Sequence, residues 1–362
     1  MPVRVIGMIG VTPPAGAASV HVIKGGISTD YLRSFAQAHE QSDFDLVLVG
    51  YTASSAEGFL VAQYAASQTT KLGYLIAHRP GFVAPTLAAR KIATSDHLTG
   101  GRLAVHIIAG ASDAEQEGDG DFQPKEVRYR RAAEYIDVMK RAWSSQKRFD
   151  FEGEFYRIKG AQSDVRPLQS PHPPIFFGGS SEGALAMGAQ HCDVFAMFGE
   201  PLAATRTRIA EFRARAAAHG RTPTFNMSFR PILAATEDEA WDKAKGILGQ
   251  IQAQQNPTGF GTIKKPLDHS ARRLLDFAAQ GAVHDARLWM PIAEATGAVG
   301  NTSCLVGTPE QVAQAMLEYY KLGVHSFLIR GFDPFNDAID FGRDLIPRLR
   351  AGAVALDRAA AA

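Results

Sequence analysis

The sequence has few cysteines, no long apolar run and no excess of charge of either sign. Its 362 residues include only two cysteines, Cys192 and Cys304, which lie far apart and imply neither a disulfide framework nor a cysteine metal site. Lys and Arg together number 38 against 37 Asp and Glu, so no basic surplus attracts nucleic acid or an anionic membrane. No apolar run approaches the ~20 residues of a membrane span. These absences predict a soluble cytoplasmic protein that binds neither nucleic acid nor a membrane.

Signatures of three other enzyme classes are also missing. The eleven histidines show no H-E-x-x-H or similar spacing, so we expect no metal site. No nucleophile-elbow signature supports a Ser–His–Asp hydrolase. No G-x-G-x-x-G follows the first strand-like run, where a doubly wound sheet would bind a dinucleotide.

What the sequence does contain is a regular alternation of apolar, strand-like runs with helical periods. Eight runs indicate strands, at 3–9, 46–51, 72–78, 103–109, 175–177, 193–198, 225–234 and 326–329. Eight strand–helix units in one chain favour a single (β/α)8 TIM barrel over residues 1–350, with an alanine-rich C-terminal tail at 351–362. A doubly wound sheet is the alternative.

Two segments interrupt the alternation. A small hairpin is expected near 148–160, where F-D-F-E-G-E-F-Y-R-I turns at Glu152-Gly153. The segment near 250–301 breaks the strand–helix rhythm, with Pro257, Gly259, Gly261 and Pro266 near its start, and is typical of a lid. Trp289 and Phe260 in that segment, with Phe198 and Phe332 at strand ends, are candidates for an apolar cover, although aromatic side chains are more often core.

The segment P-P-I-F-F-G-G-S-S at 173–181 is the most informative motif. A short apolar run enters Gly178 and Gly179, then Ser180 and Ser181, and a helix-forming run follows. Glycines let the main chain approach an anion, and backbone N–H groups at a helix N-terminus favour a phosphate. The motif therefore predicts a phosphate site, and a serine-capped turn is the alternative.

Several segments together resemble one enzyme family. Residues 85–102, P-T-L-A-A-R-K-I-A-T-S-D-H-L-T-G-G-R, resemble the third-helix signature of the bacterial luciferase-like flavin-dependent monooxygenases. Four further segments match that family in order and spacing: Arg128-Tyr129, the 173–181 motif, C-D-V-F-A-M-F-G-E-P at 192–201 and L-V-G-T-P-E-Q-V at 305–312. Over nearly the whole chain the sequence is most similar to the alkanesulfonate monooxygenases.

The resemblance implies a barrel that binds FMN and assigns residues to it. By matching position, Tyr129, Ser180 and Ser181 are expected to contact the flavin phosphate. His106 falls where many relatives carry asparagine near the flavin ring, and Ala109-Gly110 falls where the ring packs. The alternatives are a helix-surface tyrosine for Tyr129 and a hydrogen-bonded core histidine for His106.

The sequence departs from the alkanesulfonate monooxygenases at their polar catalytic positions. Ser55 stands where they carry a cysteine, Ser228 and Arg230 stand where they carry an arginine and a histidine, and Phe332 replaces a tyrosine. Their lid arginine has no evident counterpart near 295–300. The scaffold and the flavin site are thus expected to be retained, while the substrate chemistry is left open.

This chain offers other candidates for catalysis. Arg230 and Arg330 lie at or near the ends of the last two strands, and guanidinium groups at one barrel mouth suit an anionic substrate. Arg79 is a weaker candidate, and structural ion pairs with carboxylates are the alternative for all three. His78 ends the third strand and is a candidate to orient the reacting group or transfer a proton, or else a core histidine. Tyr51 and Ser55 are expected to line the same mouth, whereas His21 in the first loop has no assignable role.

Taken together, the sequence predicts a two-component monooxygenase. It would use O2 and reduced FMN, supplied by a separate NAD(P)H-dependent flavin reductase, to oxygenate a small organic substrate, with an anionic organosulfur compound as the leading candidate. The resemblance also implies a homodimer or homotetramer. Two alternatives remain: a flavin- or deazaflavin-dependent oxidoreductase that moves a hydride without O2, and a flavin-binding barrel without monooxygenase activity.

Overall fold

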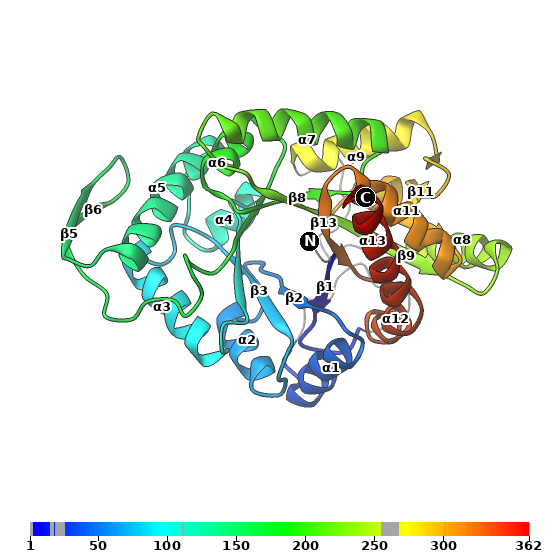
Figure 1. Ribbon diagram of the computed structural model, residues 1–362, viewed down its shortest axis with the longest axis horizontal. Coiled ribbons are helices and arrows are strands. Elements are labelled where there is room, and N and C mark those ends of the chain that lie inside the picture. The colour runs from blue at the N-terminus through cyan, green and yellow to red at the C-terminus, as the bar shows by residue number, and fades with distance from the viewer. Residues whose placement is uncertain are drawn as a thin grey trace.

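A closed ring of eight parallel strands forms the centre of the molecule (Figure 1). The computed structural model describes residues 3–14, 18, 26–110, 112–254, 268–300 and 302–361. The ring contains, in order around it, β1 (Arg4–Ile9), β2 (Leu46–Val49), β3 (Gly73–His78), β4 (Leu103–Ile107), β7 (Ile175–Gly178), β8 (Val194–Phe198), β9 (Thr224–Leu233) and β13 (Val324–Ile329). Pairing of β13 with β1 closes it. The expected TIM barrel and its eight strands are confirmed.

Helices cover the outside of the ring (Figure 1). They are α1 (Thr29–Gln41), α2 (Gly58–Ala66), α3 (Pro85–Leu98), α5 (Lys125–Ser144), α6 (Glu182–His191), α7 (Leu202–Ala217) and α11 (Pro309–Lys321). Local sequence explains their starts. For example, α3 has proline in its first turn, and Thr308 and Gln311 form a capping box at the start of α11.

Side chains of the strands alternate between the inside of the barrel and the helix layer. The inside contains an apolar cluster of Ile6, Leu75, Ala104, Phe176, Val194 and Leu328. Their neighbours along the strands, such as Val5, Tyr74 and Val105, pack with the helices in the main core. Because both faces are buried, the strands are apolar almost throughout, which is the pattern that made them recognisable.

The 250–301 segment is largely regular structure in its described part. It contains the end of α8 (Glu237–Ala253), then α9 (His269–Gln280), β10 (Val283–His284), β11 (Leu288–Trp289) and α10 (Pro291–Thr296). A further strand, β12 (Cys304–Gly307), pairs in parallel with the part of β9 that extends beyond the ring. Trp289 and Phe332 are buried in a second apolar core there, whereas Phe260 lies outside the described residues.

The remaining elements are the expected hairpin, a short helix and the C-terminal helices. The hairpin is β5 (Phe149–Glu152) with β6 (Arg157–Ala161), and α4 (Asp113–Gly118) precedes α5. The chain closes with α12 (Pro334–Asp340), a π-helical turn (Phe341–Leu345) and α13 (Ile346–Ala361). The alanine-rich end is helical up to Ala361. The described chain contains no helix with the length and apolarity to cross a membrane.

Candidate functional site

The C-terminal ends of the eight strands form one mouth, which is where (β/α)8 barrels place their active sites. The 178–181 turn lies at this mouth, after β7. Ser181 caps α6, and its hydroxyl accepts the N–H of Ala184 at 3.4 Å. A Cβ on Gly178 would lie 2.5 Å from the carbonyl oxygen of Ala196, and one on Gly179 would lie 2.6 Å from Cβ of Ala184. The two glycines thus permit a close approach of backbone that no other residue type allows here. We name residues 178–181 the cradle.

Tyr129 forms one wall of the cradle. Its ring, 6% exposed, stands edge-on to Phe177 with 6.2 Å between ring centroids, and its hydroxyl is hydrogen-bonded to the side chain of Ser181. Burial raises the pKa of Tyr129, and the nearby carboxylates of Asp268 and Glu126 raise it further. The phenol therefore stays protonated at neutral pH and is able to donate a hydrogen bond to an anion.

Helix α9 borders the cradle on another side. The Ser270 hydroxyl lies 3.1 Å from that of Ser180. Arg208 donates to the carbonyl of Gly179 at 2.9 Å and to Glu200 at 2.8 Å, and Glu200 also accepts from Arg273 of α9 at 2.6 Å. One buried carboxylate thus links α7, α9 and the cradle.

Arg128 holds the loop after β4. Its guanidinium donates to the carbonyls of Ala109 at 2.7 Å and Gln123 at 2.6 Å, and it pairs with Asp113 at 2.8 Å. Gly110 adopts a left-handed conformation (φ +79°), and a Cβ there would collide with Gln116. The loop expected to pack against the flavin ring is therefore fixed by a buried cation, a role that the sequence motif alone did not assign to Arg128.

His106 points into the barrel at the mouth. It shares the inward face of β4 with Ala104, and its ring stacks on Phe176 at 6.5 Å between centroids. Burial lowers the pKa of His106 to about 4, so the ring is neutral at pH 7. Its Nδ1 atom has no hydrogen-bond partner within the described residues. A buried, unsatisfied imidazole nitrogen at this position is available to a bound molecule.

Arg330 and Ser228 also face inward at the mouth. Arg330 directly follows β13, two residues after the inward-facing Leu328, is partly exposed, and its Nη1 lies 3.0 Å from the sulfur of Met8. Burial and the neighbouring charge of Arg230 lower the pKa of Arg330. The Gly300 backbone lies close to this guanidinium. Arg330 therefore places a cation among the inward-facing side chains.

His78 is placed differently from the expectation. Alternation along β3 puts Leu75 inside and His78 against the helices, where its Nε2 lies 2.8 Å from the hydroxyl of Tyr135 and its ring is edge-on to Phe59. Burial, with a smaller effect of Lys91, lowers its pKa to about 3. The structure thus gives His78 the alternative role of a hydrogen-bonded core histidine. Side chains alternate along β3, and His78 falls on the face that packs against the helices and not on the face that lines the barrel.

The lowered pKa of His78 predicts a pH dependence of stability. Because the unfolded chain takes up this proton near pH 6.5 and the folded chain only near pH 3, the free energy of unfolding should fall as pH decreases through that window, by up to about 1.4 kcal/mol per unit. Above pH 6.5 this residue adds no dependence. We expect His78→Gln to flatten the slope between pH 6.5 and 5 in urea titrations, whatever its effect at pH 7.5. An unchanged slope would contradict the assignment.

Arg230 lies in the interior and not on the surface of the mouth. It is fully buried, its guanidinium lies 4.6 Å from the ring centroid of Phe332, and Nη1 donates to the carbonyl of Gly331 at 3.0 Å. Burial lowers its pKa to about 10, against the opposing effects of Cys304 and Asp337. The expectation that it faces a ligand therefore needs correction: where β9 leaves the ring, the segment after β13 covers this side chain.

Tyr51, Ser55 and Arg79 belong to a network around the loop after β2. The Tyr51 hydroxyl donates to Asp119 at 3.0 Å, and the Arg79 guanidinium stacks 4.4 Å from the Tyr51 ring centroid while pairing with Glu115 at 2.6 Å. The hydroxyl of Ser55 donates to the carbonyl of Thr52. Arg79 thus forms the structural ion pairs weighed as its alternative, although its partners from α4 were not foreseen.

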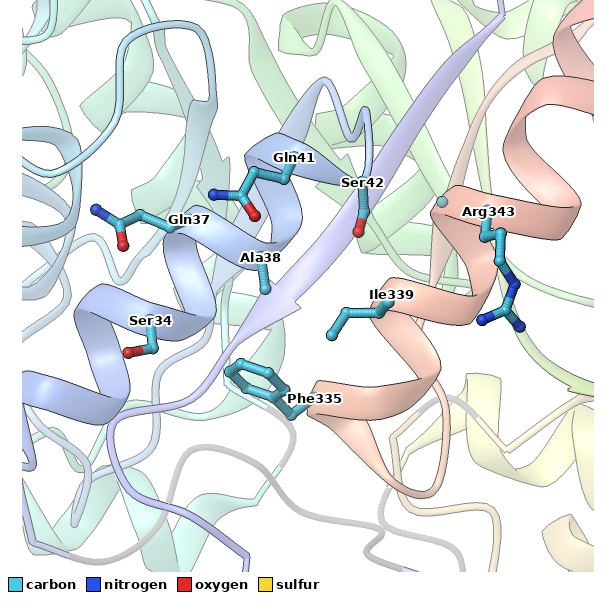
Figure 2. A pocket seen from close by; sticks show the side chains of 9 residues that line it. Ser34, Gln37, Ala38, Gln41, Ser42, Phe335, Ile339 and Arg343 are labelled. Carbon is cyan, nitrogen blue, oxygen red and sulfur yellow. The ribbon is translucent and has the colours of Figure 1, made fainter.

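Two cavities lie away from the barrel axis. A groove of about 490 Å³ on the side of the barrel runs between α1 and α12, lined by residues that include Gln37, Gln41, Phe335 and Arg343 (Figure 2). A second cavity of about 410 Å³ lies between α6, α7 and α9 behind Ser180. The described residues contain no cluster of His, Cys, Asp or Glu able to hold a metal ion.

A (β/α)8 barrel with a glycine–serine cradle after its fifth ring strand, and with an unsatisfied histidine nitrogen on the neighbouring strand β4, defines a candidate binding site at the mouth. Residues 8–326 match the family described as luciferase-like monooxygenase. The chain therefore belongs to the luciferase-like monooxygenase family.

Solved structures share the fold over nearly the whole chain. Riboflavin lyase RcaE, solved with modified FMN and riboflavin, has a TM-score of 0.78 at 21% identity, covering 97% of this chain and 92% of its own. EDTA monooxygenase EmoA from Chelativorans sp. BNC1 has a TM-score of 0.75 at 18% identity, covering 97% and 94%. An F420-dependent secondary alcohol dehydrogenase has a TM-score of 0.68 at 17% identity, covering 96% and 99%.

Proposed function

We propose that this protein is a two-component monooxygenase that uses reduced FMN and O2 to oxygenate a small organic substrate. The cradle at the barrel mouth supports this most directly. Gly178 and Gly179 let the main chain pass close to Ala196 and Ala184, and the turn that they form presents the hydroxyls of Ser180 and Ser181, the latter hydrogen-bonded to Tyr129. Membership of the luciferase-like monooxygenase family supports the oxygen chemistry.

The described residues fit an FMN molecule. Tyr129, Ser180 and Ser181 would hold the phosphate, and the loop at Ala109-Gly110 would pack against the flavin ring. His106 would offer its unsatisfied Nδ1 to the flavin or the substrate. When bound, reduced FMN supplies the two electrons with which O2 gives one oxygen atom to the substrate and one to water. The chain itself must bind, orient and exclude water.

For the substrate we propose a small anion, with an organosulfur compound such as an alkanesulfonate as the first candidate. Arg330 supports this, because a partly exposed guanidinium at the mouth pairs well with a carboxylate, sulfonate or sulfate. EmoA oxidises EDTA, a polycarboxylate by its name, so an anion is compatible with this fold. Ser55, Ser228 and Phe332 replace polar catalytic residues of the alkanesulfonate monooxygenases, so the identity of the substrate is not determined.

Hydride transfer without O2 is the second candidate function. The same barrel occurs in an F420-dependent secondary alcohol dehydrogenase, so a deazaflavin in place of FMN is compatible with this fold. A flavin-binding barrel without monooxygenase activity is a further alternative, because this chain carries other residues at the polar catalytic positions of the alkanesulfonate monooxygenases.

An anaerobic binding titration with a coupled assay separates these functions. We expect reduced FMN to bind at least about tenfold tighter than oxidised FMN, and tighter than reduced F420. With a flavin reductase, NAD(P)H, O2 and a panel of sulfonates and carboxylates, we expect product beyond the hydrogen peroxide background, with sulfite scored separately. Tight F420 binding with alcohol oxidation would favour the dehydrogenase, and flavin binding without any product would favour the non-catalytic barrel.

A further inference from the structure

Helix α9 is fixed against the cradle by its first two turns. Asp268 caps it by accepting the N–H of Ala271 at 2.8 Å, and Ser270 in the first turn meets Ser180. One turn later Arg273 pairs with Glu200, to which its Nε donates at 2.9 Å and its Nη2 at 2.6 Å. Because Arg208 joins the same carboxylate to the carbonyl of Gly179, the position of Ser270 is fixed relative to the backbone of the cradle.

The Ser270 hydroxyl lies 3.1 Å from that of Ser180, one of the hydroxyls already assigned to the phosphate. The negative charge of Asp268, the residue that caps α9, raises the pKa of Tyr129, whose hydroxyl is hydrogen-bonded to the side chain of Ser181. A phosphate monoester presents three acceptor oxygens, and hydroxyl donors on several sides of it satisfy them better than one loop does. The Ser180–Ser270 pair is thus formed by two hydroxyls that an anion can separate and bind.

Glu126, in contrast to these hydroxyls, disfavours a bound phosphate. Its carboxylate lies against Gly183 in the first turn of α6, where a Cβ on Gly183 would collide with it, and it also raises the pKa of Tyr129. A carboxylate beside a helix N-terminus is favourable by itself, but it occupies the electrostatic position that a phosphate would take. Glu126 is exposed, so it is able to swing away when a phosphate arrives, at a cost to affinity.

We propose that Ser270 of α9 is a phosphate-binding residue of this site and that Glu126 opposes phosphate binding, so that together they set the preference for FMN over riboflavin. The proposal rests on the proposed FMN function. It assigns a cofactor-selecting role to a helix from the segment that interrupts the strand–helix alternation, whereas the cradle and Tyr129 supply the remaining contacts.

The test compares affinities of reduced FMN and reduced riboflavin by anaerobic fluorescence titration. Ser270→Ala should weaken FMN binding about tenfold and leave riboflavin unchanged, because only the phosphate loses a donor. Glu126→Gln should strengthen FMN binding several-fold, again without changing riboflavin. Glu182→Gln is the matched control, since it removes a charge at the first turn of α6, the turn that Glu126 of α5 lies against, but Glu182 is exposed and paired with Arg215. It should leave FMN affinity within about twofold.

The possible results distinguish failure of this inference from failure of the proposed FMN function. Binding of neither flavin by the wild-type chain would overturn the proposed function itself. Preference for FMN in the wild type, with both variants keeping the wild-type ratio of affinities, would overturn the inference and leave the function standing. An equal gain in Glu182→Gln and Glu126→Gln would replace the specific role of Glu126 by a general charge effect. Thermal unfolding of each variant, with a midpoint within a few degrees of wild type, confirms that it folds.

Discussion

Replacing Arg128 by methionine is expected to lower the free energy of unfolding by about 3 kcal/mol. The arginine is 2% exposed and donates to the carbonyls of Ala109 and Gln123 and to the carboxylate of Asp113. Methionine keeps the buried aliphatic arm but leaves those acceptors without their donor. The measurement is urea denaturation followed by circular dichroism, with the m-value checked for two-state unfolding.

The control lies two residues along the same helix. Arg130 is 55% exposed and pairs with Glu154, so Arg130→Met should change the free energy of unfolding by no more than about 0.5 kcal/mol. If FMN binds as proposed, Arg128→Met should also weaken its binding, because the Ala109-Gly110 loop loses the group that holds it. A cost below about 1 kcal/mol for Arg128→Met would show that the loop keeps its conformation without the arginine.

The barrel was predictable because its strands are buried on both faces. Each of the eight apolar runs is short, bounded by turn residues and followed by a helical period, and each became a ring strand. Because both faces of each strand are buried and apolar, the sequence does not show which side chains point into the barrel. Tyr74, Leu75, Ile76 and Ala77 are all apolar or aromatic, so nothing in the sequence of β3 shows that His78 faces the helices.

The candidate site was predictable only where a motif carried it. Tyr129 is hydrogen-bonded to Ser181 of the cradle, and the contact of these residues with a flavin phosphate is a proposal. Arg230 was misplaced because β9 runs past the ring and pairs with β12, a strand of only four residues that follows the irregular segment. Long-range contacts such as Ser180 with Ser270, ninety residues apart, leave no local signal beyond the capping aspartate of α9.

Gly178→Ala should remove the cradle and cost about 2–3 kcal/mol of stability. Gly178 pairs with Ala196 across β7 and β8, and the new methyl group would lie 2.5 Å from the carbonyl oxygen of Ala196. That oxygen belongs to the backbone of a ring strand, so it cannot move aside as a flexible side chain would. The two strands must separate at the mouth, which displaces Ser180 and Ser181 from Tyr129. We therefore expect reduced-FMN affinity to fall by more than about tenfold.

A second glycine distinguishes this steric effect from the usual consequence of adding a methyl group. Gly246 lies exposed within α8, and a Cβ there would meet no atom within 4 Å. Gly246→Ala should therefore stabilise the protein by about 0.5–1 kcal/mol and leave flavin affinity unchanged. Urea denaturation and the anaerobic titration measure both variants side by side. If Gly178→Ala keeps wild-type stability and FMN affinity, the β7–β8 contact is looser than the structure shows, and the phosphate must be held elsewhere.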